Sequence, residues 1–247
     1  MNLLIVFVIA FFSLFQPITP SPDDLAIQAA SAYASGNYQE ALRLYETLLT
    51  EFQSPELYFN LGNTYAKLDE DGYALVNYLR AAEYIPRDQD LRLNIAMIRA
   101  RRIEPVTAYS GFWESIAQST KDNVTAAELA LVGIVLWWVM WGLYLLKFTR
   151  FNRYRLRYPI LGIIVALFMV ITCMGLVRFV VDTQHPEAVI LQDDIQAMSG
   201  PGSDYLDLFV LYVADEVRII QRENGWVRVQ QPNLREGWIR ADQLGDV

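Results

Sequence analysis

Two long apolar runs without a charged residue occupy the middle of the chain, at residues 129–146 and 158–176. A helix rises about 1.5 Å per residue, so about 18 to 20 apolar residues span the hydrocarbon core of a bilayer. The pattern therefore predicts two transmembrane helices, over residues 126–148 and 158–181. The alternative is a pair of helices buried in a soluble core, but the flanking segments are too small to enclose both on every face.

The segment between the apolar runs is basic and has no acidic residue. Short loops with this bias stay on the cytoplasmic side of a membrane, and their cations can also contact anionic lipid headgroups. If the loop at residues 149–157 is inside, both flanking parts of the chain lie outside. The cations that predict this orientation are Lys147, Arg150, Arg153, Arg155 and Arg157.

A shorter apolar run lies near the start of the chain, at residues 3–15. Its length is typical of the core of a signal peptide, and export agrees with the predicted orientation of the hairpin. No Lys or Arg precedes the run, and no A-x-A-like cleavage site follows it. Residues 1–20 are therefore predicted to be either a signal peptide or an uncleaved N-terminal anchor.

A helical pattern with an internal repeat extends over residues 21–105. Ser21 and Ser54 each stand as an N-cap before a proline at the first helical position, which is a strong signal for the start of a helix. The two signals lie 33 residues apart, the length of one helix-turn-helix repeat. Small and aromatic residues recur at the same phase, with Tyr45 matching Tyr78. This segment is predicted to hold two helical repeats.

The second repeat resembles the tetratricopeptide (TPR) family. The resemblance implies paired helices, closed by a further helix at residues 90–102 that covers the exposed face. Asp71 stands where the family has an aromatic residue, and Ala29 of the first repeat stands where it has a packing glycine. The residues at consensus places are Tyr58, Leu61, Gly62, Tyr65, Ala74, Tyr78, Ala81 and Pro86.

In TPR proteins the first helix of each pair lines a concave groove, so the resemblance implies a peptide-binding surface. Amide and cationic side chains presented together can hold a peptide backbone and a carboxylate. We expect Asn63 to point away from the helix-packing face that Gly62 marks. The alternative is that these polar residues bind nothing. The positions that the resemblance assigns to the groove are Asn60, Asn63, Lys67, Asn94 and Arg101.

Residues 106–125 connect the repeats to the first apolar run. Phe112, Trp113 and Ile116 fall on one helical face, which suits a helix lying at the membrane surface. The alternative is a plain linker that packs on the repeats. Thr125 and Glu128 form a capping-box pattern immediately before the apolar run and predict where its helix begins.

From residue 182 to residue 247 the apolar period changes to two, with turn residues between short runs. This pattern predicts short strands, and about 60 residues of this kind suit a small closed barrel. Residues 198–202, Gly225-Trp226 and Gly237-Trp238 resemble the bacterial SH3-like (SH3b) family. The resemblance implies a module that binds peptides or cell-wall components. We expect Trp226 to lie in the core and Trp238 to be the candidate for surface binding.

Composition limits the chemistry that the chain can perform. The net charge of −8 and the lack of a basic patch outside the loop argue against nucleic-acid binding. The only cysteine, Cys173, lies in the second apolar run, and His185 is the only histidine. A catalytic Cys-His pair or an ordinary zinc site cannot be assembled from them. We therefore expect no catalytic residues, no metal site and no cofactor.

The order of these segments resembles the BatE-type proteins of bacterial aerotolerance operons. The expected fold class is a multidomain membrane protein with all-α TPR repeats, a transmembrane helical hairpin and a C-terminal all-β SH3-like barrel. The resemblance implies a non-enzymatic scaffold in the cytoplasmic (inner) membrane, with both terminal domains periplasmic, that associates with von Willebrand A-domain membrane proteins and a MoxR-type ATPase. The alternative is a wall-binding accessory or targeting subunit of a peptidoglycan-modifying enzyme.

Overall fold

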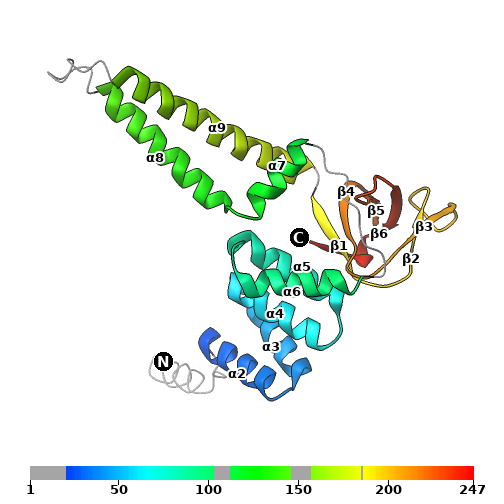
Figure 1. The fold of residues 1–247 in the computed structure, drawn as a ribbon. Coiled ribbons are helices and arrows are strands. Elements are labelled where there is room, and N and C mark those ends of the chain that lie inside the picture. The colour runs from blue at the N-terminus through cyan, green and yellow to red at the C-terminus, as the bar shows by residue number, and fades with distance from the viewer. Residues whose placement is uncertain (1–20, 103–111, 146–156, 185) are drawn as a thin grey trace, which may run out of the picture. The chain divides into compact units, whose positions relative to one another are not determined.

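The computed structural model describes residues 21–102, 112–145, 157–184 and 186–247 (Figure 1). The predicted signal or anchor segment and His185 lie outside the described residues, as do Lys147, Arg150, Arg153 and Arg155 of the basic loop. The chain divides into two compact units, Met1–Phe52 and Gln53–Val247. This boundary falls inside the predicted repeat segment, between its two helical pairs.

The described part of the first unit is one pair of helices, α2 (Pro22–Ala34) and α3 (Tyr38–Leu49). The Ser21 hydroxyl accepts a hydrogen bond from the Asp24 backbone N–H at 3.2 Å and caps α2, as the Ser-Pro signal predicts. The buried residues of this pair are Ala29 on α2 and Ala41, Leu44, Tyr45 and Leu48 on α3.

The second unit begins with three helices, α4 (Pro55–Lys67), α5 (Asp71–Tyr84) and α6 (Gln89–Ala100). The buried ring of Tyr78 lies directly on Gly62, where a Cβ would come within 2.5 Å of the ring. The absence of a side chain therefore lets the aromatic ring fill the gap between α4 and α5. This is the pairing of small and aromatic positions that the repeat pattern predicts.

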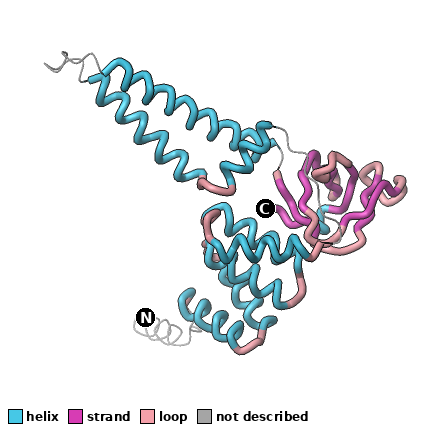
Figure 2. The backbone as a smooth tube through the Cα atoms, viewed as in Figure 1, coloured by secondary structure: helices cyan, strands magenta, loops and turns pink. Residues whose placement is uncertain are grey.

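Three further helices follow: α7 (Phe112–Lys121), α8 (Ala126–Leu145) and α9 (Arg157–Gln184). α8 and α9 lie side by side (Figures 1 and 2), with Trp137 and Phe168 in ring contact at 5.9 Å. Within the described residues, one segment, Gly162–Val180 of α9, is long and apolar enough to cross a membrane by length and composition. α8 contains a shorter apolar segment, Ala126–Gly142. Most side chains of both segments are exposed.

The chain ends in a seven-stranded antiparallel sheet with the strand order β3-β2-β6-β5-β4-β1-β7. A tight turn at Asn224 and Gly225, both with positive φ, joins β4 to β5, as expected for a two-residue hairpin. The strands are β1 (Glu187–Ile190), β2 (Ile195–Met198), β3 (Asp207–Leu211), β4 (Glu216–Glu223), β5 (Trp226–Gln230), β6 (Glu236–Arg240) and β7 (Leu244–Asp246).

The core of the sheet comes from alternate positions along the strands, as a half-buried strand requires. A 3₁₀ turn, Ala241–Gln243, leads into β7. The buried cluster includes Ile190, Ile195, Leu211, Val217, Val227, Val229 and Ile239. The division that the sequence pattern predicts is thus confirmed at the level of secondary structure: helices precede residue 185, and strands of period two follow it.

Candidate functional site

Two of the five predicted groove residues meet where α4, α5 and α6 join. The side-chain oxygen of Asn63 accepts hydrogen bonds from the Tyr78 hydroxyl at 2.8 Å and from the Asn94 amide nitrogen at 2.9 Å. Asn63 and Asn94 are half-buried, so these bonds satisfy polar groups inside the helical packing. The prediction that Asn63 points away from the packing face is wrong, because its oxygen bonds the same tyrosine that packs on Gly62.

The other three predicted groove residues have different surroundings. Arg101, the C-cap of α6, pairs with the Asp71 carboxylate at 2.7 Å and so turns toward α5. Lys67 is exposed in the last turn of α4, and Asn60 is half-buried on the same helix. The structure therefore joins Asn63 to Asn94 and ties Arg101 to α5. Peptide binding by this set stays a prediction.

The burial of the two tryptophans of the sheet is the opposite of what we expected. Trp238 is 8% exposed, so it is not the surface candidate that its Gly-Trp motif predicts, whereas Trp226 is only half-buried. Trp238 stands opposite Met198 on β2 and Arg228 on β5, and these long side chains can cover an outward-facing ring. Trp226 lies at the start of β5, where fewer neighbours can cover it.

The outer face of α5 lies against the sheet. A Cβ at Gly72 would come within 2.7 Å of the Ile190 carbonyl oxygen and 2.9 Å of the Leu191 Cα. One turn along α5, a side-chain carbon of Val76 would lie 2.5 Å from a Cβ at Gly245. One more turn along, Arg80 donates to the Asp246 carbonyl at 2.7 Å. Gly72, Val76 and Arg80 form the docking face of α5.

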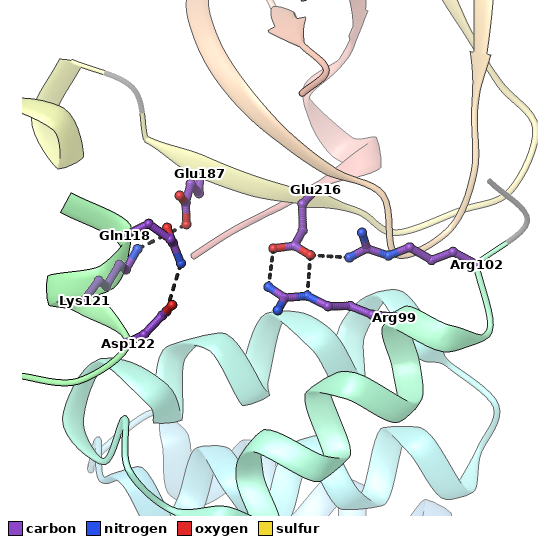
Figure 3. A network of polar contacts seen from close by, with 7 residues as sticks. All are labelled: Arg99, Arg102, Gln118, Lys121, Asp122, Glu187 and Glu216. Carbon is purple, nitrogen blue, oxygen red and sulfur yellow. Dashed lines mark hydrogen bonds and ion pairs between the residues drawn. The ribbon is translucent and has the colours of Figure 1, made fainter. Parts of the chain in front are cut away.

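Glu216, at the start of β4, receives two arginines from the end of α6 (Figure 3). Arg99 donates to its carboxylate through Nε and Nη2, both at 2.8 Å, and Arg102 donates from Nη2. The Arg102 side chain is 8% exposed, so its charge needs this partner. A bidentate contact between a guanidinium and a carboxylate fixes the orientation of the two groups as well as the distance between them. We call these three residues the Glu216 clasp.

The charges of the clasp hold one another ionised. Burial alone would raise the pKa of Glu216, but the hydrogen bonds and charges of Arg99 and Arg102 outweigh it and lower the pKa below its usual value. Burial likewise opposes the charge of Arg99, yet its bonds to Glu216 leave the pKa of its guanidinium raised. The clasp is therefore a permanent ion pair at neutral pH.

A second ion pair joins α7 to the first strand. Lys121 lies 3.1 Å from the Glu187 carboxylate, and Gln118 on the same helix donates to Asp122 at 2.9 Å (Figure 3). Glu187 and Glu216 both belong to the β1–β4 pair of the sheet. The acidic ends of these two strands thus receive cations from α6 and from α7.

The turn between α7 and α8 and the first residues of α8, together residues 122–128, are held by contacts from the α5–α6 segment. Arg87 donates to the Glu128 carboxylate at 2.5 Å, and Arg92 donates to the Asp122 carbonyl, also at 2.5 Å. From α9, the buried Arg178 donates to the Val124 carbonyl at 2.6 Å. We call residues 122–128 the hairpin base, because contacts from α5–α6 and from α9 converge on it.

Sequence reasoning missed the contacts between helices and sheet. Gly72 is the residue that could have indicated them. A glycine inside a predicted helix is unfavourable, and packing within the repeat does not require one at this position. Arg99 and Arg102 fall near the end of the helix predicted at residues 90–102, and Glu216 falls in the segment predicted to form strands. Neither pattern shows which distant segment will supply the opposite charge.

Metal binding is the other kind of chemistry that clustered side chains could support in the part of the chain that the structure describes. No cluster of three or more His, Cys, Asp or Glu side chains that could hold a metal ion occurs among the described residues. Cys173 is exposed on α9. Compared with known proteins, the chain matches no protein-family model and none of the curated proteins.

Proposed function

We propose that the protein is a non-enzymatic scaffold anchored in the cytoplasmic membrane, which presents a TPR-like helical module and an SH3-like module together on its outer side. The observation that supports this proposal best is a contact between a segment that precedes the apolar helices in the sequence and a segment that follows them. Arg99 and Arg102 precede α8, and Glu216 follows α9. Ion-paired residues cannot lie on opposite sides of a membrane.

This contact constrains how the chain can cross a bilayer. Two crossings, by α8 and α9, return the chain to the side from which it came, whereas a single crossing would separate Glu216 from its arginines. The exposed apolar surface of Gly162–Val180 favours two crossings over none, because water would surround it otherwise. The positive loop then gives the orientation, with both modules outside.

The scaffold role follows from the charged contact between the two modules. Arg99 and Arg102 of the helical module pair with Glu216 of the sheet, so these charges hold the two modules together. The proposed partners are proteins of the same membrane, for which the BatE resemblance suggests von Willebrand A-domain proteins and a MoxR-type ATPase. Two modules that contact each other and are joined to one helical hairpin suit the capture of such partners at the membrane surface.

Site-directed labelling tests the topology. In a Cys173→Ser background, single cysteines are introduced as Glu56→Cys, Asn152→Cys and Asn233→Cys and exposed to a membrane-impermeant maleimide in intact spheroplasts. We expect labelling at 56 and 233, and labelling at 152 only after lysis. Different accessibility at 56 and 233 would contradict the proposal, and so would equal accessibility at all three positions.

The non-enzymatic part of the proposal has its own test. The purified chain is incubated with peptidoglycan fragments, peptides and nucleotides, and products are followed by mass spectrometry. We expect no turnover. Reproducible hydrolysis that a single substitution abolishes would overturn the scaffold function while leaving the topology intact.

A further inference from the structure

The two edges of the sheet differ in what covers them. β7, at one edge, is met by α5 through Val76 and Arg80. β3, at the other edge, pairs with β2 along one side only, and no described strand pairs with its other side. An edge strand without a cover presents backbone N–H and C=O groups that can accept an additional strand. The β3 edge carries neither lysine nor proline, the residues that commonly block such pairing.

Exposed apolar side chains gather at the beginning of this edge. Leu206 is 77% exposed, Tyr205 is 52% exposed and Leu208 is 51% exposed. The loop that carries them is fixed, because Ser199 and Leu206 exchange hydrogen bonds and the Tyr205 ring lies on Gly200. These side chains are therefore held outward by a structured turn, and exposed apolar groups beside an open strand edge are typical of a binding surface.

The charge around the edge is acidic. Asp204 and Asp207 are exposed at the start of β3, and Asp193 and Asp194 are exposed beside its end, where Asp193 accepts from the Val213 N–H at 2.9 Å. The nearby cation is Arg235, whose guanidinium lies over the Phe209 ring at 5.3 Å. Four aspartates against one arginine leave a negative field at both ends of the strand.

We infer that the β3 edge binds an extended segment of a partner protein that has alternating apolar residues and a cation near each end. The segment would add a strand beside β3, with its backbone bonded to the edge and its cations facing the two pairs of aspartates. A second copy of this chain is the poorer occupant, because two β3 edges would bring like charges together. The acids also disfavour an anionic lipid surface. This inference rests on the proposed function only in that it assigns a ligand to one of the two modules.

Binding is tested on the full chain in detergent micelles with a fluorescent peptide, Lys-Val-Thr-Val-Lys, acetylated and amidated at its ends. The controls are Glu-Val-Thr-Val-Glu, which reverses the charge, and the lysine peptide methylated at two successive central backbone nitrogens, one of which must face β3 in either register. We expect polarisation to report binding of the lysine peptide and at least about tenfold weaker binding of both controls, or about 1.4 kcal/mol. Equal binding of the methylated peptide would overturn strand addition.

Protein variants locate the site. Leu208→Lys removes an apolar contact and adds a repelling charge at the edge, so the affinity for the lysine peptide should fall at least about tenfold. Ile220→Lys is the matched control, since Ile220 is a partly exposed residue of the interior strand β4, and it should leave binding unchanged. Asp204→Asn with Asp207→Asn should weaken binding at low salt and much less at high salt.

Hydrogen exchange separates the remaining outcomes. Peptide binding at the edge should slow amide exchange within residues 207–211 and leave α4–α6 unchanged. Protection of α4–α6 instead would make the helical groove the binding site and would overturn the edge assignment, although the scaffold function would stand. Concentration-dependent dimerisation that Leu208→Lys abolishes would show that the edge pairs with a second copy and would also overturn the proposal.

Discussion

The helices α3 and α5 occupy the same place in successive helical pairs, yet among the described residues only α5 has a partner on its outer face. Their inner faces match: Ala41 and Ala74 are fully buried, and so, nearly, are Tyr45 and Tyr78. Their outer faces differ at three positions one turn apart. Gln39, Arg43 and Thr47 of α3 are exposed, whereas the equivalent residues of α5 are Gly72, Val76 and Arg80, the docking face.

The comparison shows that a repeat can gain an interface without changing its own packing. Gly72 removes a side chain, so the backbone of the sheet can approach the helix. Val76 replaces the exposed Arg43, which on α3 pairs with Glu40 at 2.6 Å. Apolar burial on this face then contributes stability that an exposed ion pair contributes only weakly. The residues at the outer positions of the helix, and not the repeat pattern, decide which helix docks.

The largest effect on stability should come from replacing Gly72 of α5 by glutamine, the residue that α3 carries at the equivalent position 39. Gly72→Gln places a side chain against the Ile190 carbonyl and the Leu191 backbone, which cannot yield as a flexible side chain can. We expect a loss of about 3 kcal/mol in the free energy of unfolding, although glutamine is the better helix former by about 0.5 kcal/mol. Urea denaturation of the detergent-solubilised chain, followed by circular dichroism, measures it.

The matched control is the reverse exchange on α3. Gln39→Gly should cost about 0.5 to 1 kcal/mol, the ordinary penalty for glycine in an exposed helix. If Gly72→Gln is tolerated as well as Gln39→Gly, the close approach of α5 to the sheet is not a feature of the protein in solution.

A smaller effect is expected from Glu216→Gln, which keeps the shape of the clasp and removes its charge. Arg102 would then be a buried cation without a counter-ion, so we expect a loss of about 2 kcal/mol at pH 7. The value is less than for a fully buried pair, because the Arg99 and Glu216 side chains are 44% and 25% exposed. Arg43→Gln, which breaks the exposed pair of α3, should change the free energy of unfolding far less, because water screens that pair.

The difference in stability between wild type and Glu216→Gln should depend on pH in a definite direction. The pKa of Glu216 is lowered in the folded protein, so its contribution is complete above the unfolded pKa of about 4.3 and is lost as pH falls through the lower folded pKa. The gap between wild type and Glu216→Gln in urea denaturation should therefore be constant from pH 7 to about pH 5 and shrink at about pH 3. A gap that does not change with pH would mean that the carboxylate charge is not the source.

Local pattern was enough to predict the elements but not their contacts. The Ser21 and Ser54 caps, the Tyr78 ring on Gly62 and the strands after residue 185 depend on neighbours in sequence or on a fixed period, and these agree with the structure. The Glu216 clasp joins residues more than a hundred positions apart, and periodicity carries no information at that distance. No local rule could pair Arg99 with β4.

The same limit explains the candidate residues that changed role. Asn63 was assigned to a groove by its position in a repeat, but its surroundings depend on which residues α5 and α6 bring to it. Trp238 was assigned to the surface by its Gly-Trp motif, yet its burial depends on cross-strand neighbours that the motif does not show. In both cases the neighbours that surround the side chain come from other elements and could not be predicted from its own segment.

The smallest effect in the comparison concerns Arg80, the last position of the docking face. Its guanidinium donates to the Asp246 carbonyl at 2.7 Å and lies over the Tyr58 ring at 5.9 Å. Arg80→Thr, which supplies the residue of α3, should cost about 0.5 to 1 kcal/mol in urea denaturation, because both contacts are near solvent. Arg80→Lys should restore about half of this, since an ammonium keeps the charge over the ring but not the fork of donors. The reciprocal Thr47→Arg should change nothing, because α3 offers its outer face to solvent. If Arg80→Thr is also neutral, apolar contact at Gly72 and Val76 alone holds α5 to the sheet, and the arginine serves only to exclude other pairings of this edge.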